Sequence, residues 1–188
     1  MATGEIKSGS KKQVILLAVL VLFAALFVAG YVVKARKGTG GNKIIMQGDR
    51  APEFRLQSTD GRSVGLSDLR GKVVMVHFWA TWCAPCVEEL PTLAKLHQDL
   101  MGADFEMLAV SVDEGGAEAV TAFMKQNNLN VPVLLDPDRA TASSYGTYKF
   151  PETYIVDREG VVRYKVIGSR DWKDPAALQL MKDMIAAR

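Results

Sequence analysis

Two cysteines separated by two residues follow closely on a run of strand-forming residues, and this arrangement constrains the fold more than any other feature of the 188-residue chain. Residues 73–79, VVMVHFW, form a nearly continuous apolar run, which is typical of a parallel strand in the middle of a sheet, covered on both faces. The segment 83–86, CAPC, comes next and opens a stretch with apolar residues at helical spacing up to Leu100. A buried strand that leads through a CxxC motif into a helix predicts an α/β domain with a redox-active cysteine pair at the crossover.

The remaining hydrophobic pattern alternates between strands and helices, which predicts a mixed central sheet flanked by helices. An Asp-Gly turn at 58–61 joins the segments 54–57 and 62–66 into an N-terminal β-hairpin, and a second hairpin is expected from 154–156 and 161–166. The further expected elements are strands over 105–112 and 131–135 and helices over 83–100, 117–127 and 174–187.

The N-terminal region differs in composition from the rest of the chain. Residues 13–33 carry no charge and would extend roughly 31 Å as a helix, enough to cross a bilayer. A cleaved signal peptide is the alternative, but its apolar region is usually only about 7–15 residues long. We therefore expect a cytoplasmic N-terminus at 1–12, an uncleaved transmembrane signal anchor at 13–33, a linker at 34–47 and one domain at 48–188.

The net charge of +2 is divided unequally between these parts. Residues 1–43 contain seven lysines and arginines against one acidic residue, whereas the rest of the chain has 16 basic against 20 acidic residues. An acidic domain lacks the basic field that attracts phosphate backbones, so nucleic-acid binding is disfavoured. Basic residues flank the apolar segment on both sides, and charge alone therefore does not fix its orientation.

The two cysteines have different expected roles. Unpaired N–H groups and the helix dipole stabilise an anion at a helix N-terminus, which favours Cys83 as the nucleophile. Cys86, one turn later, is the expected resolving partner in a redox-active Cys83–Cys86 disulfide, and Pro85 stiffens the turn between them. The alternatives are half of a zinc site and a static short disulfide. For zinc, the only histidines, His77 and His97, lack the paired spacing of such a site. We expect no metal and no cofactor.

The sequence FWATWCAPC followed by VEELP resembles the thioredoxin superfamily, specifically its membrane-anchored TlpA/ResA/CcmG group. The resemblance extends over residues 48–168 and implies a thioredoxin fold with an N-terminal β-hairpin and a βα insertion. The opening of the domain is also similar to that of peroxiredoxins. Neither cysteine, however, lies in the Pro-x-x-x-Thr-x-x-Cys motif of those proteins.

The resemblance also implies a substrate surface beside the cysteines. Residues 150–153, FPET, match the family's cis-proline, so we expect Pro151 to be cis and a substrate peptide to pair beside it as a strand. Trp82, Pro85 and Phe150 are the other expected substrate contacts.

The sequence also contains candidate acid–base groups for the exchange reaction. Glu114, in VSVDEGG, aligns with a glutamate of this group, which implies a role in proton transfer; Asp113 is the neighbouring alternative, and a solvated loop carboxylate is the other interpretation. His77 stands where ordinary thioredoxins have a buried acid. It either accepts a proton from Cys86 or is a core histidine with its hydrogen bonds satisfied.

These features predict a membrane-anchored thiol-disulfide oxidoreductase in the inner (cytoplasmic) membrane, with its catalytic domain on the extracytoplasmic side, where disulfides persist. The resemblance implies a reductant of the CxxCH disulfide of apocytochrome c or of related secreted thiols. It also implies a membrane thiol donor of the CcdA/DsbD type. The alternatives are an oxidase that forms disulfides and a non-catalytic copper-binding module.

Overall fold

The computed structural model describes residues 15–16, 19–24, 27 and 43–187. The chain divides into two compact units, residues 1–41 and 42–188. The described residues of the first unit are helical, with exposed side chains. In this described part of the chain, no helix is both long and apolar enough to cross a membrane. Most of the expected anchor and linker and all of the expected cytoplasmic N-terminus lie outside the described residues, so those assignments stay predictions.

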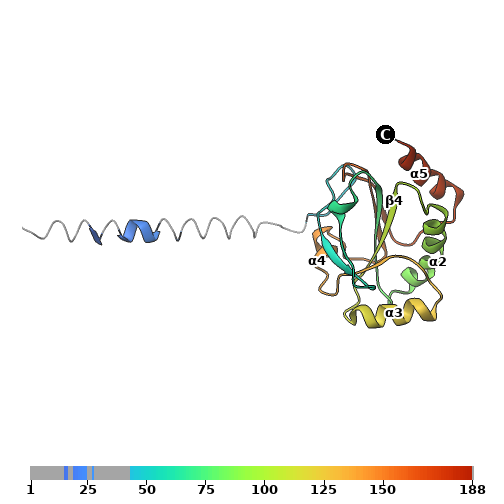
Figure 1. Ribbon diagram of the computed structural model, residues 1–188, viewed down its shortest axis with the longest axis horizontal. Coiled ribbons are helices and arrows are strands. Elements are labelled where there is room, and N and C mark those ends of the chain that lie inside the picture. Colours follow the sequence, from blue (N-terminus) through green and yellow to red (C-terminus); the bar gives the residue numbers. More distant parts are fainter. Residues whose placement is uncertain (1–14, 17–18, 25–26, 28–42, 188) are drawn as a thin grey trace, which may run out of the picture. The chain divides into compact units, whose positions relative to one another are not determined.

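The second unit is built on one mixed sheet with the strand order β2-β1-β5-β4-β3-β6-β7 (Figure 1). Its strands are β1 (Arg55–Ser58), β2 (Ser63–Gly65), β3 (Val73–Trp79), β4 (Phe105–Ser111), β5 (Val133–Leu135), β6 (Glu152–Val156) and β7 (Val162–Ile167). Both hairpins and the expected strands are confirmed. Central β3 is parallel to β4 but antiparallel to β6, so the expectation of a parallel central strand holds on one side only.

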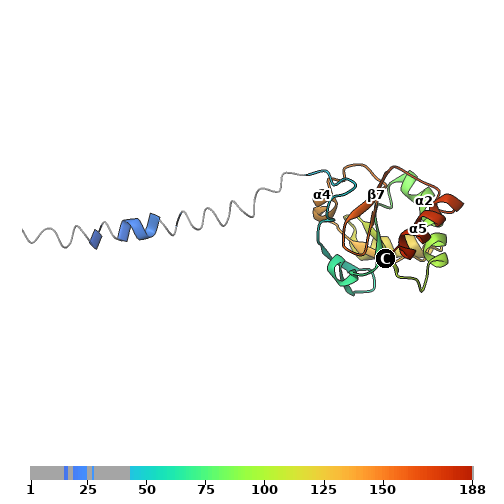
Figure 2. The same ribbon diagram turned by 90° about the horizontal axis from the view of Figure 1, so that it is seen from above.

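Helices cover both faces of this sheet. They are η1 (Leu66–Leu69), α2 (Ala84–Asp99), α3 (Gly116–Gln126), α4 (Ala140–Ser144) and α5 (Pro175–Ala186). In both views α2 and α5 lie together on one side of the sheet and α4 lies on the other (Figures 1 and 2). All seven residues of β3 are buried between these layers, which explains why its sequence is apolar except for His77. The thioredoxin-like α/β fold is thereby confirmed.

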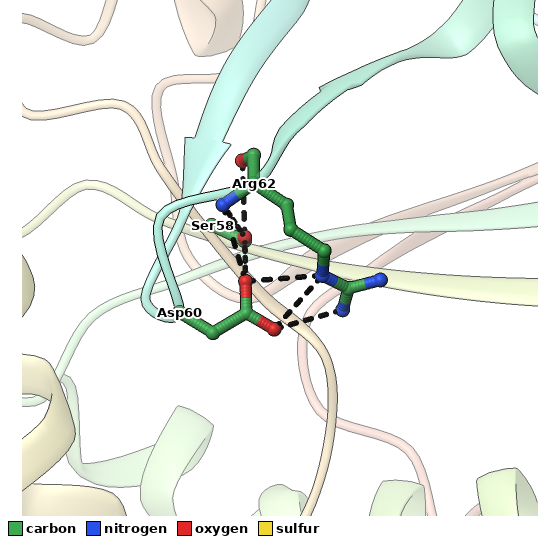
Figure 3. A network of polar contacts seen from close by, with 3 residues as sticks. All are labelled: Ser58, Asp60 and Arg62. Carbon is green, nitrogen blue, oxygen red and sulfur yellow. Dashed lines mark hydrogen bonds and ion pairs between the residues drawn. The ribbon is translucent and has the colours of Figure 1, made fainter.

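The turn of the first hairpin shows why its sequence favours a sharp reversal. The Asp60 carboxylate accepts hydrogen bonds from the Ser58 hydroxyl and from the backbone and side chain of Arg62 (Figure 3). These hydrogen bonds, led by that of Ser58, lower the pKa of Asp60. Gly61 has a φ of 84°, a conformation that side-chain-bearing residues rarely adopt. The Asp-Gly pair thus stabilises the turn that fixes the register of β1 against β2.

Helix α4 was not expected from the sequence. It has only five residues, too short for a hydrophobic period to indicate it. Its first N–H group, that of Ala140, donates to Asp138 at 3.1 Å, and the next two, those of Thr141 and Ala142, donate to the buried Asp136 carboxylate at 3.0 and 2.8 Å. Arg139, directly before the helix, has a φ of 57°. Two carboxylates, the buried Asp136 and the exposed Asp138, therefore hold this short helix and the turn that carries Arg139.

Candidate active site

The two cysteines form a disulfide bond at the N-terminus of α2, with their Cα atoms 5.2 Å apart. Cys83 is the N-cap residue and Pro85 lies in the first turn. Cys83 is 8% exposed, whereas Cys86 is 0% exposed. A thiolate on Cys83 would therefore be slightly accessible to solvent beside the unpaired N–H groups of α2, and a thiol on Cys86 would be enclosed.

Pro151 lies at the same end of the sheet as the disulfide, and the Phe150–Pro151 peptide bond is cis. Strand β6 begins at the next residue, Glu152, which pairs with Phe78 near the C-terminal end of β3. Because Cys83 follows that end of β3, the two loops that carry Cys83 and Pro151 share one edge of the domain.

Trp82 connects these two loops. Its ring packs edge-on against Phe150, with the ring centroids 6.1 Å apart, yet Trp82 remains 59% exposed. Trp82 also contacts Arg139, whose guanidinium lies 5.7 Å from the centroid of the Trp82 ring. The structure thus places an exposed aromatic group and a cation beside the disulfide, and both can contact a partner protein.

Glu114 lies at the outer edge of this surface. Its side chain is 81% exposed, and its carboxylate is 3.5 Å from the Arg139 guanidinium. Asp113 points the other way: it is buried, and Thr81 and Ser111 donate hydrogen bonds to its carboxylate. The structure therefore separates these neighbouring acids, and the role of Glu114 in proton transfer stays a prediction.

His77 is fully enclosed on β3. Its Nδ1 lies 2.9 Å from the hydroxyl of Thr153, which is two residues after Pro151, and its Nε2 has no hydrogen-bond partner among the described residues. Burial lowers the pKa of His77 to about 3, so the ring is neutral at physiological pH. A ring with so low a pKa is a weak base, which favours a core histidine over a proton acceptor, but within the described chain only one of its two nitrogens has the hydrogen bond that the core interpretation expected.

Glu89 is a titratable residue of the site that the sequence analysis missed. It is buried on α2, three residues after Cys86, so both side chains share one helix face. Burial raises its pKa to about 7, against the hydrogen bonds donated by the Trp172 indole and the Arg170 backbone. Its other oxygen, Oε2, has no hydrogen-bond partner in the described part of the chain. A carboxyl group that exchanges protons near neutral pH therefore lies one helical turn from the buried cysteine.

This spacing could have identified Glu89, because a carboxylate three residues after a buried cysteine projects towards the interior. Within residues 43–187, no three histidine, cysteine or acidic side chains lie close enough together to hold a metal ion.

Comparison with known proteins agrees with this geometry. Residues 47–165 match the AhpC/TSA family. The thiol-disulfide oxidoreductase ResA of Bacillus subtilis (strain 168) is 40% identical over 129 residues, which are 69% of this chain and 72% of that protein. ResA of Geobacillus thermodenitrificans is 31% identical over 164 residues, 87% of this chain and 93% of that protein.

Among solved structures, a Chlorobium tepidum protein assigned as the thiol:disulfide interchange protein DsbE is 31% identical, with a TM-score of 0.64 over 76% of this chain and 96% of that chain. These matches confirm the resemblance to thioredoxin-like thiol-disulfide oxidoreductases.

Proposed function

Because this chain belongs to the AhpC/TSA family and is a thiol-disulfide oxidoreductase of the ResA and DsbE type, we propose that it reduces protein disulfides on the extracytoplasmic side of the inner membrane. The observation that carries the proposal is the unequal exposure of the two sulfurs at the N-terminus of α2. The more accessible Cys83 can attack a partner's disulfide, and the enclosed Cys86 acts in the second step.

The exchange proceeds in two attacks. The Cys83 thiolate attacks one sulfur of the substrate disulfide, which forms a mixed disulfide and releases the first substrate thiolate. The Cys86 thiolate then attacks Cys83, which releases the second substrate thiolate and leaves the Cys83–Cys86 disulfide. Two electrons pass to the substrate in each cycle, and a dithiol donor restores the enzyme.

The second attack requires that a buried thiol lose its proton. Glu89 lies one turn further along α2, and its pKa of about 7 lets it accept a proton at neutral pH and return it after exchange. We assign Glu89 this role in preference to Glu114, whose carboxylate is exposed and contacts Arg139.

The membrane anchor is supported by composition. Residues 13–33 are uncharged, and those of them that the structure describes are helical with exposed apolar side chains. Exposed apolar helical surface of this kind is favourable in lipid and unfavourable in water. We therefore retain a single-pass anchor with residues 1–12 in the cytoplasm. A reporter active only outside the cytoplasm, fused after Arg188, should be active; an inactive fusion at normal protein level would contradict this topology.

The proposed substrate is the CxxCH disulfide of apocytochrome c or a related secreted protein, and the proposed donor is a membrane protein of the CcdA/DsbD type. Both follow from the resemblance to the ResA group. Exposed Trp82 supports a protein substrate, because an indole beside the reactive sulfur can contact an extended peptide.

The reduction potential of the Cys83–Cys86 pair tests the proposed direction of electron flow. A reductant should have a potential near that of thioredoxin, about −270 mV, whereas a disulfide-forming oxidase would lie nearer about −120 mV. Equilibration with glutathione or dithiothreitol buffers measures this value, and a potential in the oxidase range would contradict the proposed reductant.

A further inference from the structure

Asp113 is a buried carboxylate at the end of β4, and it binds the short segment that connects β3 to the CxxC motif. Its two oxygens accept the Thr81 backbone N–H at 3.1 and 3.2 Å, and one accepts the Thr81 hydroxyl at 2.6 Å. The Ser111 hydroxyl donates a further hydrogen bond at 2.7 Å. The Thr81 donors lie on the segment that follows β3, and Ser111 is the last residue of β4.

The Asp113 carboxylate adds a contact between the two chain segments just beyond the last backbone hydrogen bond that joins β3 and β4. The Val112 N–H donates to the Trp79 carbonyl at 3.0 Å, which is the end of the β3–β4 ladder. Past that point the chains separate, and the Asp113 side chain serves as the acceptor for Thr81. Hydrogen bonds to a charged acceptor are roughly twice as strong as neutral ones, so this contact restrains the connecting segment firmly.

We propose that Asp113 is a positioning residue for thiol-disulfide exchange: it fixes Thr81, and through Trp82 it keeps the Cys83 sulfur at the N-terminus of α2. The inference rests on exchange at Cys83 and is independent of the substrate and of the direction of electron flow. Between Thr81 and Cys83 there is only Trp82, whose side chain is largely exposed. The half-buried Thr81 thus anchors the segment before the nucleophile from its side chain, in addition to the backbone hydrogen bond that Cys83 donates to the Ala80 carbonyl at 3.2 Å.

The same geometry distinguishes positioning from a simple charge effect. A carboxylate near a thiolate disfavours the negative charge, so removal of the charge alone would lower the pKa of the Cys83 thiol. Loss of alignment with the N–H groups of α2 would instead raise that pKa, because those groups stabilise the thiolate. The sign of the shift therefore identifies which effect Asp113 exerts.

The test uses the reduced full-length protein and four variants: Asp113→Ala, Asp113→Asn, Thr81→Val and the double variant Asp113→Ala/Thr81→Val. The rate of reduction of 5,5′-dithiobis(2-nitrobenzoate) and the pH dependence of Cys83 alkylation are measured for each. Asp113→Ala should slow reduction about tenfold and raise the pKa of Cys83. Thr81→Val, which keeps the backbone N–H, should give a smaller loss of the same sign. The double variant should be no slower than Asp113→Ala.

Asp113→Asn is the rescue variant, because its amide oxygen still accepts from Thr81; its rate should stay within about threefold of wild type. Asp157→Ala is the matched control. That carboxylate also accepts three hydrogen bonds in a turn, from the Glu159 and Val161 N–H groups and from Arg163, but it follows the opposite end of β6 from Pro151. The control should lose stability and leave the pKa of Cys83 unchanged.

Two results would overturn the inference: a pKa of Cys83 that is unchanged or lowered in Asp113→Ala, or a rate loss in Asp113→Ala no larger than in the Asp157→Ala control. A wild-type protein that reduces no disulfide, together with a raised Cys83 pKa in Asp113→Ala, would refute the exchange reaction but support the positioning. The two failures are therefore distinguishable.

Discussion

The two sides of the disulfide differ in what surrounds them. The buried side consists of Cys86, His77 and Glu89, all nearly inaccessible to solvent. The exposed side consists of Trp82, Glu114 and Arg139, which lie at the surface. Burial shifts the pKa values of His77 and Glu89 far from their ordinary range, to about 3 and about 7. In the proposed mechanism, proton transfer by Glu89 therefore belongs to the buried side and partner contact to the exposed side.

Replacement of each cysteine in turn should have the largest effect on this division. Cys83→Ser should abolish exchange, because the more accessible sulfur, which makes the first attack, is lost. Cys86→Ser should keep the first attack and accumulate a mixed disulfide, because the second attack is lost. Non-reducing electrophoresis with a disulfide-containing peptide measures both. Accumulation in Cys83→Ser instead would reverse the assigned roles.

Glu89 should give the next largest effect, on stability. Its pKa is raised from 4.5 to about 7, so the folded state holds the proton more tightly than the unfolded state. The free energy of unfolding therefore falls as pH rises from 4.5 through about 7, and the loss is about 3 kcal/mol above pH 7. Urea unfolding of Glu89→Gln should lack this loss.

The exposed neighbour Glu88 supplies the matched control for that experiment, since Glu88→Gln should follow the wild-type pH dependence. Trp172→Phe should move the pH range of this stability loss upward, because the indole hydrogen bond lowers the pKa of Glu89. An unchanged pH slope in Glu89→Gln would show that this carboxyl does not ionise near neutrality.

His77 should have a smaller effect of opposite sign. Folding lowers the pKa of His77 from 6.5 to about 3, so between these values the unfolded state binds a proton that the folded state does not bind. Stability is present above pH 6.5 and is lost as pH falls, by about 2 kcal/mol at pH 5. His77→Asn should remove this loss, while His97→Asn should retain it. A persistent loss in His77→Asn would contradict a buried neutral imidazole.

The exposed side should give the smallest effects. Trp82→Ala should lower kcat/KM for a protein disulfide about fivefold, because apolar contact area is lost. Arg139→Ala should lower it about twofold or less, because its contacts with Glu114 and Trp82 are both exposed. Both variants should keep the rate of reaction with a small disulfide. A large loss with the small reagent would place these residues in the chemistry itself.

The fold was predictable wherever the hydrophobic period was long. The apolar run of β3 and the Asp-Gly turn of the first hairpin each indicate one local structure, and both are confirmed. Helix α4 has five residues and is held by the Asp136 and Asp138 carboxylates just before it, so it is too short for a hydrophobic period to indicate it. The antiparallel pairing of β3 with β6 likewise depends on tertiary contacts rather than on β3 itself.

The site divides in the same way. The CxxC motif placed Cys83 and Cys86 at a strand-to-helix crossover because that signal is local and strong. The contacts of Asp113 with Thr81 and of Arg139 with Trp82 join residues more than 30 positions apart, and no local pattern indicates them. Glu89 was detectable from helical spacing, but its raised pKa required knowledge of its burial.

The unequal reactivity of the two cysteines is the central claim, and competitive alkylation of the reduced protein tests it directly. Brief treatment with iodoacetamide at pH 7, followed by mass spectrometry of the peptide that carries residues 83–86, measures the label on each sulfur. The structure predicts at least about tenfold more label on Cys83, because its thiolate is stabilised at the N-terminus of α2 and is the more accessible of the two sulfurs. Equal labelling, or faster labelling of Cys86, would contradict the account.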